Sequence, residues 1–246
     1  MSEATYHAAV FGATSSIASE TLRAIVAERN AYFLLIGRNH DRLEAVASDL
    51  RTRGAQCEIL EADLLSPDAD WKSHLEGREW DLILLAHGSL PDQGKSLTNP
   101  HDLGREMDIN LLSPLRIMAA SLPVFEAQQR GTLAVFGSVA GDRGRQSNFL
   151  YGSAKAGVET FVEGLRHRLS SLPSVSVVLL KPGMTDTPMT AHLEKGPLFS
   201  PAEKVGQDAW SAIKNGRAVA YLPGWWWFIM TAVKLLPRPL FHKTSL

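Results

Sequence analysis

The sequence predicts an α/β fold built as one doubly wound domain, with a parallel sheet of seven strands between layers of helices. Two observations lead to this prediction. Short apolar runs alternate along the chain with longer helical patterns, as in successive βαβ units. The length of 246 residues suits one large domain, and no repeat, low-complexity stretch or linker divides it. We assign residues 1–222 to this domain and residues 223–246 to a short C-terminal extension.

Seven short apolar runs are the candidate strands of the sheet. Each is rich in β-branched or aliphatic side chains and is followed by turn residues or a helical pattern. In chain order they are residues 8–11, 32–36, 57–61, 82–86, 133–137, 176–180 and 218–222. Their largely apolar character predicts strands that are buried on both faces, as in a parallel sheet.

Helical patterns fill the intervals between these runs, at residues 17–28, 42–53, 111–129 and 154–169. Ser200, Pro201 and Glu203 have the order of an N-cap, a first-turn proline and a capping-box acid, so we expect a helix that includes residues 205–213. Residues 184–199 contain two prolines and a glycine and are expected to form a loop over the carboxyl ends of the strands. This loop is the candidate substrate lid.

The charge balance and the single cysteine exclude several classes of protein. The chain has 25 Lys and Arg against 26 Asp and Glu and a net charge of −1, which argues against nucleic acid as a partner. Cys57 has no partner for an intrachain disulfide, and one thiol cannot supply a zinc cluster, so we expect no metal site. The N-terminus lacks the basic and long apolar regions of a signal peptide, so we expect a cytoplasmic protein.

A glycine and several small residues stand between the first candidate strand and the first candidate helix. Residues 12–18 read Gly-Ala-Thr-Ser-Ser-Ile-Ala. Small residues at this point let backbone amides approach a pyrophosphate group at the N-terminus of the helix. An ordinary serine-capped helix start explains the segment equally well, because only Gly12 remains of the three glycines that a dinucleotide-binding loop usually has.

Tyr151 and Lys155 are four residues apart and therefore share one face of a helix. An ammonium group beside a phenol lowers the phenol pKa from its usual value of about 10, which would make Tyr151 an acid or base near neutral pH. This pair alone is weak evidence for a site. Its context is stronger, because Ser138 ends a candidate strand at the edge where ligands bind in α/β folds. Asn110 precedes another long helical pattern.

With these motifs in this order, the chain resembles the short-chain dehydrogenase/reductase family from about Tyr6 to Leu222. The resemblance implies a Rossmann-like fold and an enzyme that transfers a hydride between NAD(P) and a carbon that carries oxygen. In the reductive direction Tyr151 would protonate the oxygen and Ser138 would hydrogen-bond it. Lys155 would lower the pKa of Tyr151 and bind the ribose, and Asn110 would anchor a water of the proton relay.

The resemblance also implies a site for NADP, with NAD as the alternative. Arg38 follows the second strand where no acid is present, which suits the 2′-phosphate of NADP; if Arg38 only stacks beside the adenine, both cofactors are usable. Ser16 and His87 depart from the family pattern, and we interpret His87 as a structural or cofactor-contacting side chain rather than a catalytic one. The implied cofactor residues are Gly12, Thr14, Ser15, Ser16, Ile17, Arg38, Asp63, Leu64, Ala86, His87, Gly88, Pro182, Gly183, Thr185 and Thr187.

The C-terminal extension differs in charge from the rest of the chain. All acidic residues lie at or before Asp208, so the chain carries −6 up to that point and +5 after it. Residues 225–227 are three consecutive tryptophans, within an apolar stretch that is too short to span a bilayer. Tryptophan and lysine favour the headgroup region of a membrane, so peripheral membrane contact is one interpretation. An interface of a homo-oligomer is the other.

This extension, together with residues 12–18 and 141–149, resembles the branch of the family that reduces decaprenylphosphoryl-2-keto-ribose. That resemblance implies a keto-sugar on a polyprenyl phosphate, a flavin oxidase as partner, and a place at the inner face of the membrane. Arg143 and Arg145 would then face the lipid phosphate, or else be solvated loop charges. The alternatives are a reductase of a soluble carbonyl or 3-oxoacyl substrate, and a non-catalytic NADP-binding module that senses redox state.

Overall fold

Seven strands form one parallel sheet in the computed structural model of the chain, which describes residues 4–244. The strand order is β3-β2-β1-β4-β5-β6-β9, so the chain winds outward from β1 on one side and from β4 on the other. The strands are β1 (Tyr6–Phe11), β2 (Ala31–Gly37), β3 (Gln56–Glu61), β4 (Leu82–Leu85), β5 (Gly131–Phe136), β6 (Val175–Pro182) and β9 (Val219–Leu222). The predicted fold class is confirmed, and every predicted strand overlaps an observed one.

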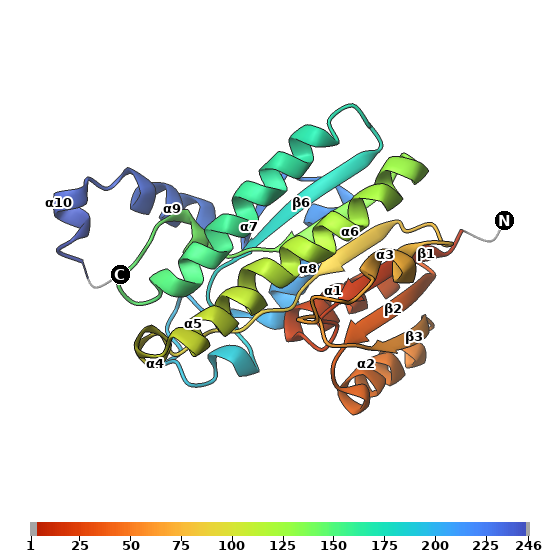
Figure 1. Ribbon diagram of the computed structural model, residues 1–246, viewed down its shortest axis with the longest axis horizontal. Coiled ribbons are helices and arrows are strands. Elements are labelled where there is room, and N and C mark those ends of the chain that lie inside the picture. Colours follow the sequence, from red (N-terminus) through yellow and green to blue (C-terminus); the bar gives the residue numbers. More distant parts are fainter. Residues whose placement is uncertain (1–3, 245–246) are drawn as a thin grey trace.

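Helices cover both faces of this sheet, and each layer closes its own core (Figure 1). Successive residues of β1 alternate between the two cores, with Ala8 and Val10 on one face and Ala9 and Phe11 on the other. One layer consists of α1 (Ser16–Val26), α2 (His40–Thr52) and α8 (Ala202–Lys214). The other consists of α3 (Trp71–Leu75), α6 (Ser113–Gln128) and α7 (Phe149–Arg168).

The remaining elements are short and connect the carboxyl ends of the strands to the next helix. They are α4 (Gln93–Thr98), α5 (Pro100–Met107), the π-helical turn η1 (Asp108–Leu112), the 3-10 turns η2 (Val139–Asp142) and η3 (Pro188–Thr190), and a small sheet of β7 (Thr185–Asp186) and β8 (Ser200–Pro201). Residues 184–199, the predicted lid, therefore contain a strand and a helical turn of their own.

The predicted cap of the helix after residue 200 is wrong. Ser200 pairs with Thr185 in the small sheet, and its backbone N–H donates to the Met184 carbonyl at 3.0 Å. The helix α8 begins at Ala202, Pro201 is its N-cap, and no side chain caps it. Ser200 cannot cap the helix because it is part of a strand that pairs with the lid segment.

The C-terminal extension folds into α9 (Trp226–Leu235) and α10 (Arg238–Phe241), which lie at the end of the molecule opposite the N-terminus (Figure 1). Trp226 and Met230 of α9 are buried against Val139, just after the end of β5. The outer side chains Trp227, Phe228 and others remain exposed. No helix within residues 4–244 is long and apolar enough to cross a membrane.

Candidate active site

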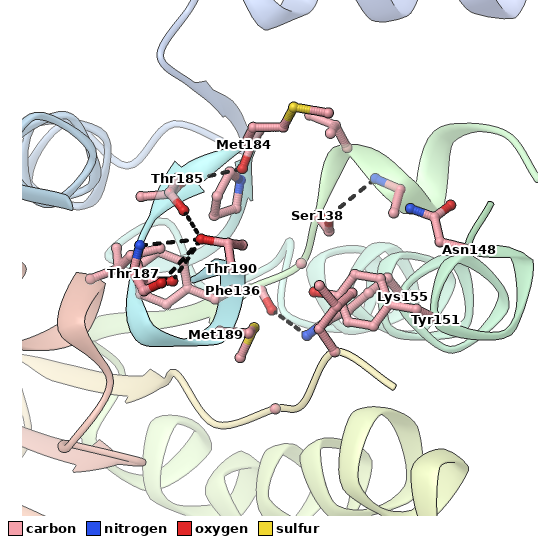
Figure 2. Close-up of a pocket in the computed structure, with 18 of the residues that line it drawn as sticks. Phe136, Ser138, Asn148, Tyr151, Lys155, Met184, Thr185, Thr187, Met189 and Thr190 are labelled. Atoms are coloured by element: carbon pink, nitrogen blue, oxygen red, sulfur yellow. Dashed lines mark hydrogen bonds between the residues drawn. The ribbon is translucent and has the colours of Figure 1, made fainter. Parts of the chain in front are cut away.

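A cavity of about 430 Å³ lies at the carboxyl ends of β1, β4, β5 and β6 (Figure 2). This is the edge at which open α/β sheets bind ligands. Three of the four predicted catalytic side chains line the cavity, namely Ser138, Tyr151 and Lys155. The predicted cofactor residues in its wall are Ser15, Ile17, Ala86, His87, Gly88, Pro182, Gly183, Thr185 and Thr187.

The fold places Ser138, Tyr151 and Lys155 together from two elements. Ser138 caps the turn η2, and its Oγ accepts a hydrogen bond from the Ala140 backbone at 3.1 Å, so its own proton is free to be donated. Tyr151 and Lys155 lie in the first two turns of α7, which begins at Phe149, earlier than the predicted residue 154. Lys155 Nζ lies 5.6 Å from the centre of the Tyr151 ring and donates to the Phe136 carbonyl at 3.0 Å.

The expectation that Lys155 lowers the pKa of Tyr151 is not met in this structure. Burial raises the pKa of Tyr151 to about 12, and the Ser138 hydroxyl opposes that shift only in part. Burial also lowers the pKa of Lys155 to about 8, against the smaller effect of Glu159. The sequence spacing predicts that Tyr151 and Lys155 lie close together. It does not predict that both are buried, and burial is the main cause of both pKa shifts. Tyr151 is therefore a neutral phenol at neutral pH, the form that a proton donor needs.

Asn110 is buried behind the cavity rather than in its wall. Its Oδ1 accepts from the Ser89 backbone at 3.0 Å, and its Nδ2 donates to the Ser89 hydroxyl at 3.0 Å. The residue lies in the π-helical turn η1, a distortion that is common at functional sites. A side chain at Gly88 would meet both Asn110 and the Lys155 ammonium, so both predicted residues lie next to this glycine.

His87 has an unambiguous tautomer in its hydrogen-bond network. The Ser113 hydroxyl donates to the Leu64 carbonyl at 2.6 Å, so the His87 Nε2, at 2.9 Å from the same hydroxyl, must be the donor. The Nδ1 is then an acceptor, and it is buried without a partner among the described residues. Burial lowers the pKa of His87 to about 3, so the ring is neutral and fits a ligand hydroxyl.

The family model described as short chain dehydrogenase matches residues 6–197. The chain belongs to the short-chain dehydrogenase family. It is an NAD(P)-dependent oxidoreductase. Two of its curated relatives, both named as uncharacterized oxidoreductases, are 30% identical: one from Streptomyces coelicolor over 95% of this chain and 94% of its own length, and one from Mycobacterium tuberculosis over 95% of each.

Solved structures of this family share the fold. A short-chain dehydrogenase from Sphingobium yanoikuyae in complex with NADPH has a TM-score of 0.81 at 22% identity, covering 97% of this chain and 96% of that one. A 3-oxoacyl-[acyl-carrier protein] reductase from Brucella melitensis in complex with NAD has a TM-score of 0.76 at 21% identity, covering 91% and 98%.

The loop between β1 and α1, where the sequence predicts the phosphates of the cofactor, has features that fit a dinucleotide. Gly12 has φ of +81°, and a Cβ there would lie 2.6 Å from the His87 backbone nitrogen, so only glycine fits. Ser15 caps α1 by accepting from the Ala18 backbone at 3.5 Å. The start of α1 and the orphaned His87 Nδ1 thus offer a backbone cradle and an acceptor, and both fit a dinucleotide.

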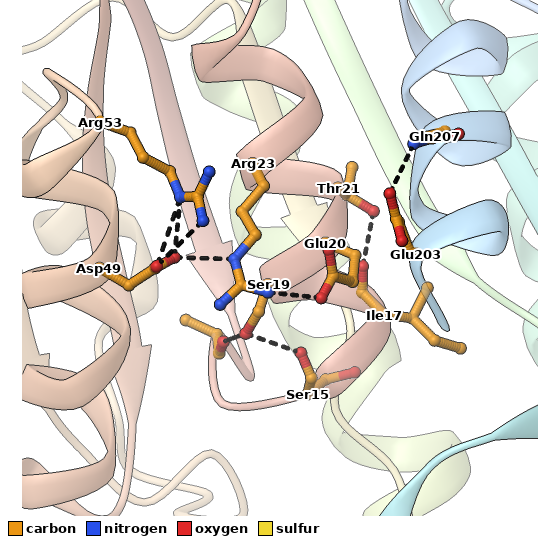
Figure 3. A network of polar contacts seen from close by, with 11 residues as sticks. Ser15, Ile17, Ser19, Glu20, Thr21, Arg23, Asp49, Arg53, Glu203 and Gln207 are labelled. Atoms are coloured by element: carbon orange, nitrogen blue, oxygen red, sulfur yellow. Dashed lines mark hydrogen bonds and ion pairs between the residues drawn. The ribbon is translucent and has the colours of Figure 1, made fainter. Parts of the chain in front are cut away.

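Helix α1 begins directly after this loop, and polar side chains connect it to α2 (Figure 3). Arg23 donates to Asp49 of α2 at 2.7 Å and to Glu20 at 2.6 Å. Ser19 donates to the Ser15 carbonyl at 3.1 Å, next to the cap. The Arg23–Asp49 pair joins the last turn of α1 to α2, and the other two contacts lie within α1 and its cap.

Other predicted cofactor residues lie beside the cavity rather than in its wall. Arg38 is exposed directly after β2, where the adenosine half of a dinucleotide lies in doubly wound folds. Asp63 accepts from the Leu65 backbone at 3.0 Å, in the loop after β3. The residues of this group are Gly12, Thr14, Ser16, Arg38, Asp63 and Leu64, all of which follow β1, β2 or β3.

The two arginines predicted to face the substrate have different positions. Arg143 points away from the cavity: its Nη1 donates to the carbonyls of Val233 at 2.5 Å and Leu236 at 2.6 Å, at the C-terminal end of α9. Its guanidinium also lies 3.8 Å from the centre of the Phe241 ring. Arg143 therefore contacts the extension in this structure and does not face the cavity, contrary to the substrate prediction. Arg145, in contrast, lines the cavity.

Two features of the site were missed from the sequence. Trp226 of α9 forms part of the cavity wall, and a methyl group added at Gly183 would overlap its indole ring. Lys181 of β6 is buried in ion pairs with Asp142 and Glu159, and Tyr221 donates to Asp142 at 2.9 Å. The consecutive tryptophans signalled an unusual extension, but nothing local indicated that it folds back onto the site.

Proposed function

We propose that the protein reduces a ketone to a secondary alcohol with NADPH. The observation that supports this best is the grouping of the Ser138 hydroxyl, the neutral Tyr151 phenol and the Lys155 ammonium in one cavity. The nicotinamide cofactor, when bound, supplies the hydride. Tyr151 donates its proton to the carbonyl oxygen, Ser138 donates a hydrogen bond to the same oxygen, and Lys155 holds the ribose of the cofactor beside Tyr151.

The test of this function is NADPH oxidation by the purified protein across a panel of ketones. The panel includes a 3-oxoacyl thioester, simple cyclic ketones, and keto-sugars with and without a polyprenyl phosphate. Turnover of at least one ketone that requires Tyr151 supports the reductase. Tight NADPH binding without turnover of any carbonyl favours the redox-sensing alternative instead.

The preference for NADPH over NADH rests on Arg38. Replacing Arg38 by Asp removes the cation that would bind the 2′-phosphate and supplies an acceptor for ribose hydroxyls. We expect the ratio of kcat/KM for NADPH to that for NADH to fall by roughly tenfold or more. Lys72→Asp, the same charge change at an exposed side chain of α3, is the control. An unchanged ratio in Arg38→Asp would mean that Arg38 does not bind the 2′-phosphate of NADPH.

For the substrate we propose a keto-sugar carried by a polyprenyl phosphate, produced by a flavin oxidase that acts before this enzyme. The sequence resemblance to the decaprenylphosphoryl-2-keto-ribose reductase branch supports it, as does the apolar extension beside the cavity. Phe228 and Leu235 of α9 are 69% and 76% exposed, and Lys234 lies between them in the helix. Such a surface suits the headgroup region of a bilayer at the cytoplasmic side.

Vesicle co-sedimentation tests the membrane contact. We expect the protein to bind vesicles that contain an anionic phospholipid and the double variant Trp227→Ser/Phe228→Ser to lose that binding. Both side chains are exposed, so the substitutions leave the wall of the cavity intact. Loss of self-association in the variant, with no vesicle binding by either protein, would identify the surface as an interface of a homo-oligomer.

A further inference from the structure

Two polar side chains beside the catalytic residues have no partner. Arg145 Nε and Asn148 Oδ1 are buried and form no hydrogen bond with any described residue, yet both residues line the cavity. The Asn148 backbone donates to the Arg145 carbonyl at 3.1 Å, which closes the turn that holds them. Gln93 of α4 braces this turn by donating to the Gln146 carbonyl at 2.9 Å. Figure 2 shows Asn148 on the Ser138 side of the cavity, across from Thr185 and Thr187.

The surroundings of Arg145 leave its positive charge uncompensated. The cavity wall contains Lys155 and Arg145 but no Asp or Glu among the residues that the structure describes. Asp142, the acid whose charge acts on Arg145, is already paired with Lys181 and Tyr221. Burial lowers the pKa of Arg145, so solvent does little to stabilise its charge. An arginine held in this way is suited to bind an anionic ligand oxygen.

A second cavity of about 430 Å³ adjoins Arg145 on the side of the extension. Phe149 and Phe241 flank it, and His242 and Thr244 of the extension complete its wall. This wall also lacks a carboxylate within the described part of the chain. Arg145 is the residue common to the walls of both cavities, so a ligand that occupies both would contact it.

We propose that Arg145 and Asn148 form a subsite for a phosphate ester of the substrate. Arg145 Nε–H donates to a phosphate oxygen, Asn148 Oδ1 accepts from a neighbouring hydroxyl, and the remainder of the substrate continues between Phe149 and Phe241. The subsite deepens the proposed reductase function, on which it rests, because it places the phosphate beside the carbonyl at Tyr151. The phosphates of a dinucleotide belong at Ser15 and Arg38, on other loops of the sheet edge.

Calorimetric titration of the NADPH-loaded protein tests the subsite without requiring turnover. The ligands are two matched pairs, farnesyl phosphate with farnesol and ribose 5-phosphate with ribose. We expect the phosphate to tighten binding at least about tenfold in one pair, since a hydrogen bond to a charged group contributes that much. Arg145→Gln is expected to abolish the difference, and Asn148→Ala to weaken both members of the ribose pair, which carry hydroxyls beside the phosphate position. Lys95→Gln, which removes an exposed charge elsewhere, should leave it unchanged.

The outcomes separate this subsite from the function on which it rests. Preference for farnesyl phosphate identifies a lipid phosphate, and preference for ribose 5-phosphate a soluble one. Equal binding within both pairs, or a preference that survives in Arg145→Gln, overturns the subsite even if ketones are reduced. If the phosphate preference depends on Arg145 but no ketone in the panel is reduced, the reductase function fails and the anion site remains.

Discussion

Tyr151→Phe is expected to lower kcat for ketone reduction by roughly 10²–10⁴-fold, the range that positioned acid catalysis contributes. The substitution removes one oxygen and keeps the ring that packs beside Lys155. NADPH binding should therefore stay within about twofold of the natural protein, because Tyr151 acts on the carbonyl oxygen. Stopped-flow NADPH oxidation measures the first quantity and NADPH fluorescence the second. Tyr32→Phe, at a half-buried tyrosine of β2 that does not line the cavity, is the matched control.

The pH dependence of the natural enzyme follows from the same residues. Tyr151, with a pKa of about 12, stays protonated through neutral pH, so reduction needs no ionisation of this group. Lys155, with a pKa of about 8, loses its charge above that value, so kcat/KM for reduction should decline as pH rises through 8. Alcohol oxidation needs the phenolate and should accelerate with pH instead. Near-normal reduction by Tyr151→Phe would mean that Tyr151 is not the proton donor to the carbonyl oxygen.

The catalytic cluster could be predicted from the sequence because its spacing is local. Tyr151 and Lys155 are one helical turn apart, and Ser138 follows a strand that ends at the sheet edge. The strand pattern predicted the sheet for a similar reason, since each buried strand is a short apolar run. The pKa of Tyr151 was predicted in the wrong direction, because the loss of solvent around a side chain depends on the whole fold.

The contacts of the extension could not be predicted, because they join distant parts of the chain. Arg143 reaches a carbonyl ninety residues further on, at the end of α9. Trp226 packs against Gly183, and no local pattern connects an aromatic helix with a glycine after β6. The sequence offers no way to distinguish the two neighbouring arginines. In the fold, Arg143 hydrogen-bonds to the extension and Arg145 lines the cavity.

Lys181→Met is expected to lower the free energy of unfolding by about 3–5 kcal/mol, as when one partner of a buried ion pair is removed. Lys181 is 2% exposed, and its ammonium lies between Asp142 and Glu159. Methionine fills much of the same volume but leaves the buried Asp142 carboxylate and the partly buried Glu159 carboxylate without their cation. Urea denaturation at pH 7 measures the change. The exposed pair of Lys195 with Asp186 offers a matched control, since Lys195→Met should cost less than about 1 kcal/mol.

The pH dependence of this loss distinguishes a charge effect from a packing effect. Burial already raises the pKa of Glu159, and removing Lys181 withdraws the cation that opposes this shift. In Lys181→Met, Glu159 should therefore take up a proton at higher pH than in the natural protein, which relieves part of the unpaired charge. The difference in unfolding free energy should shrink as pH falls from 7 toward 5. A difference that stays constant over this range would mean that packing around Lys181, rather than its charge, stabilises the junction between β6, η2 and α7.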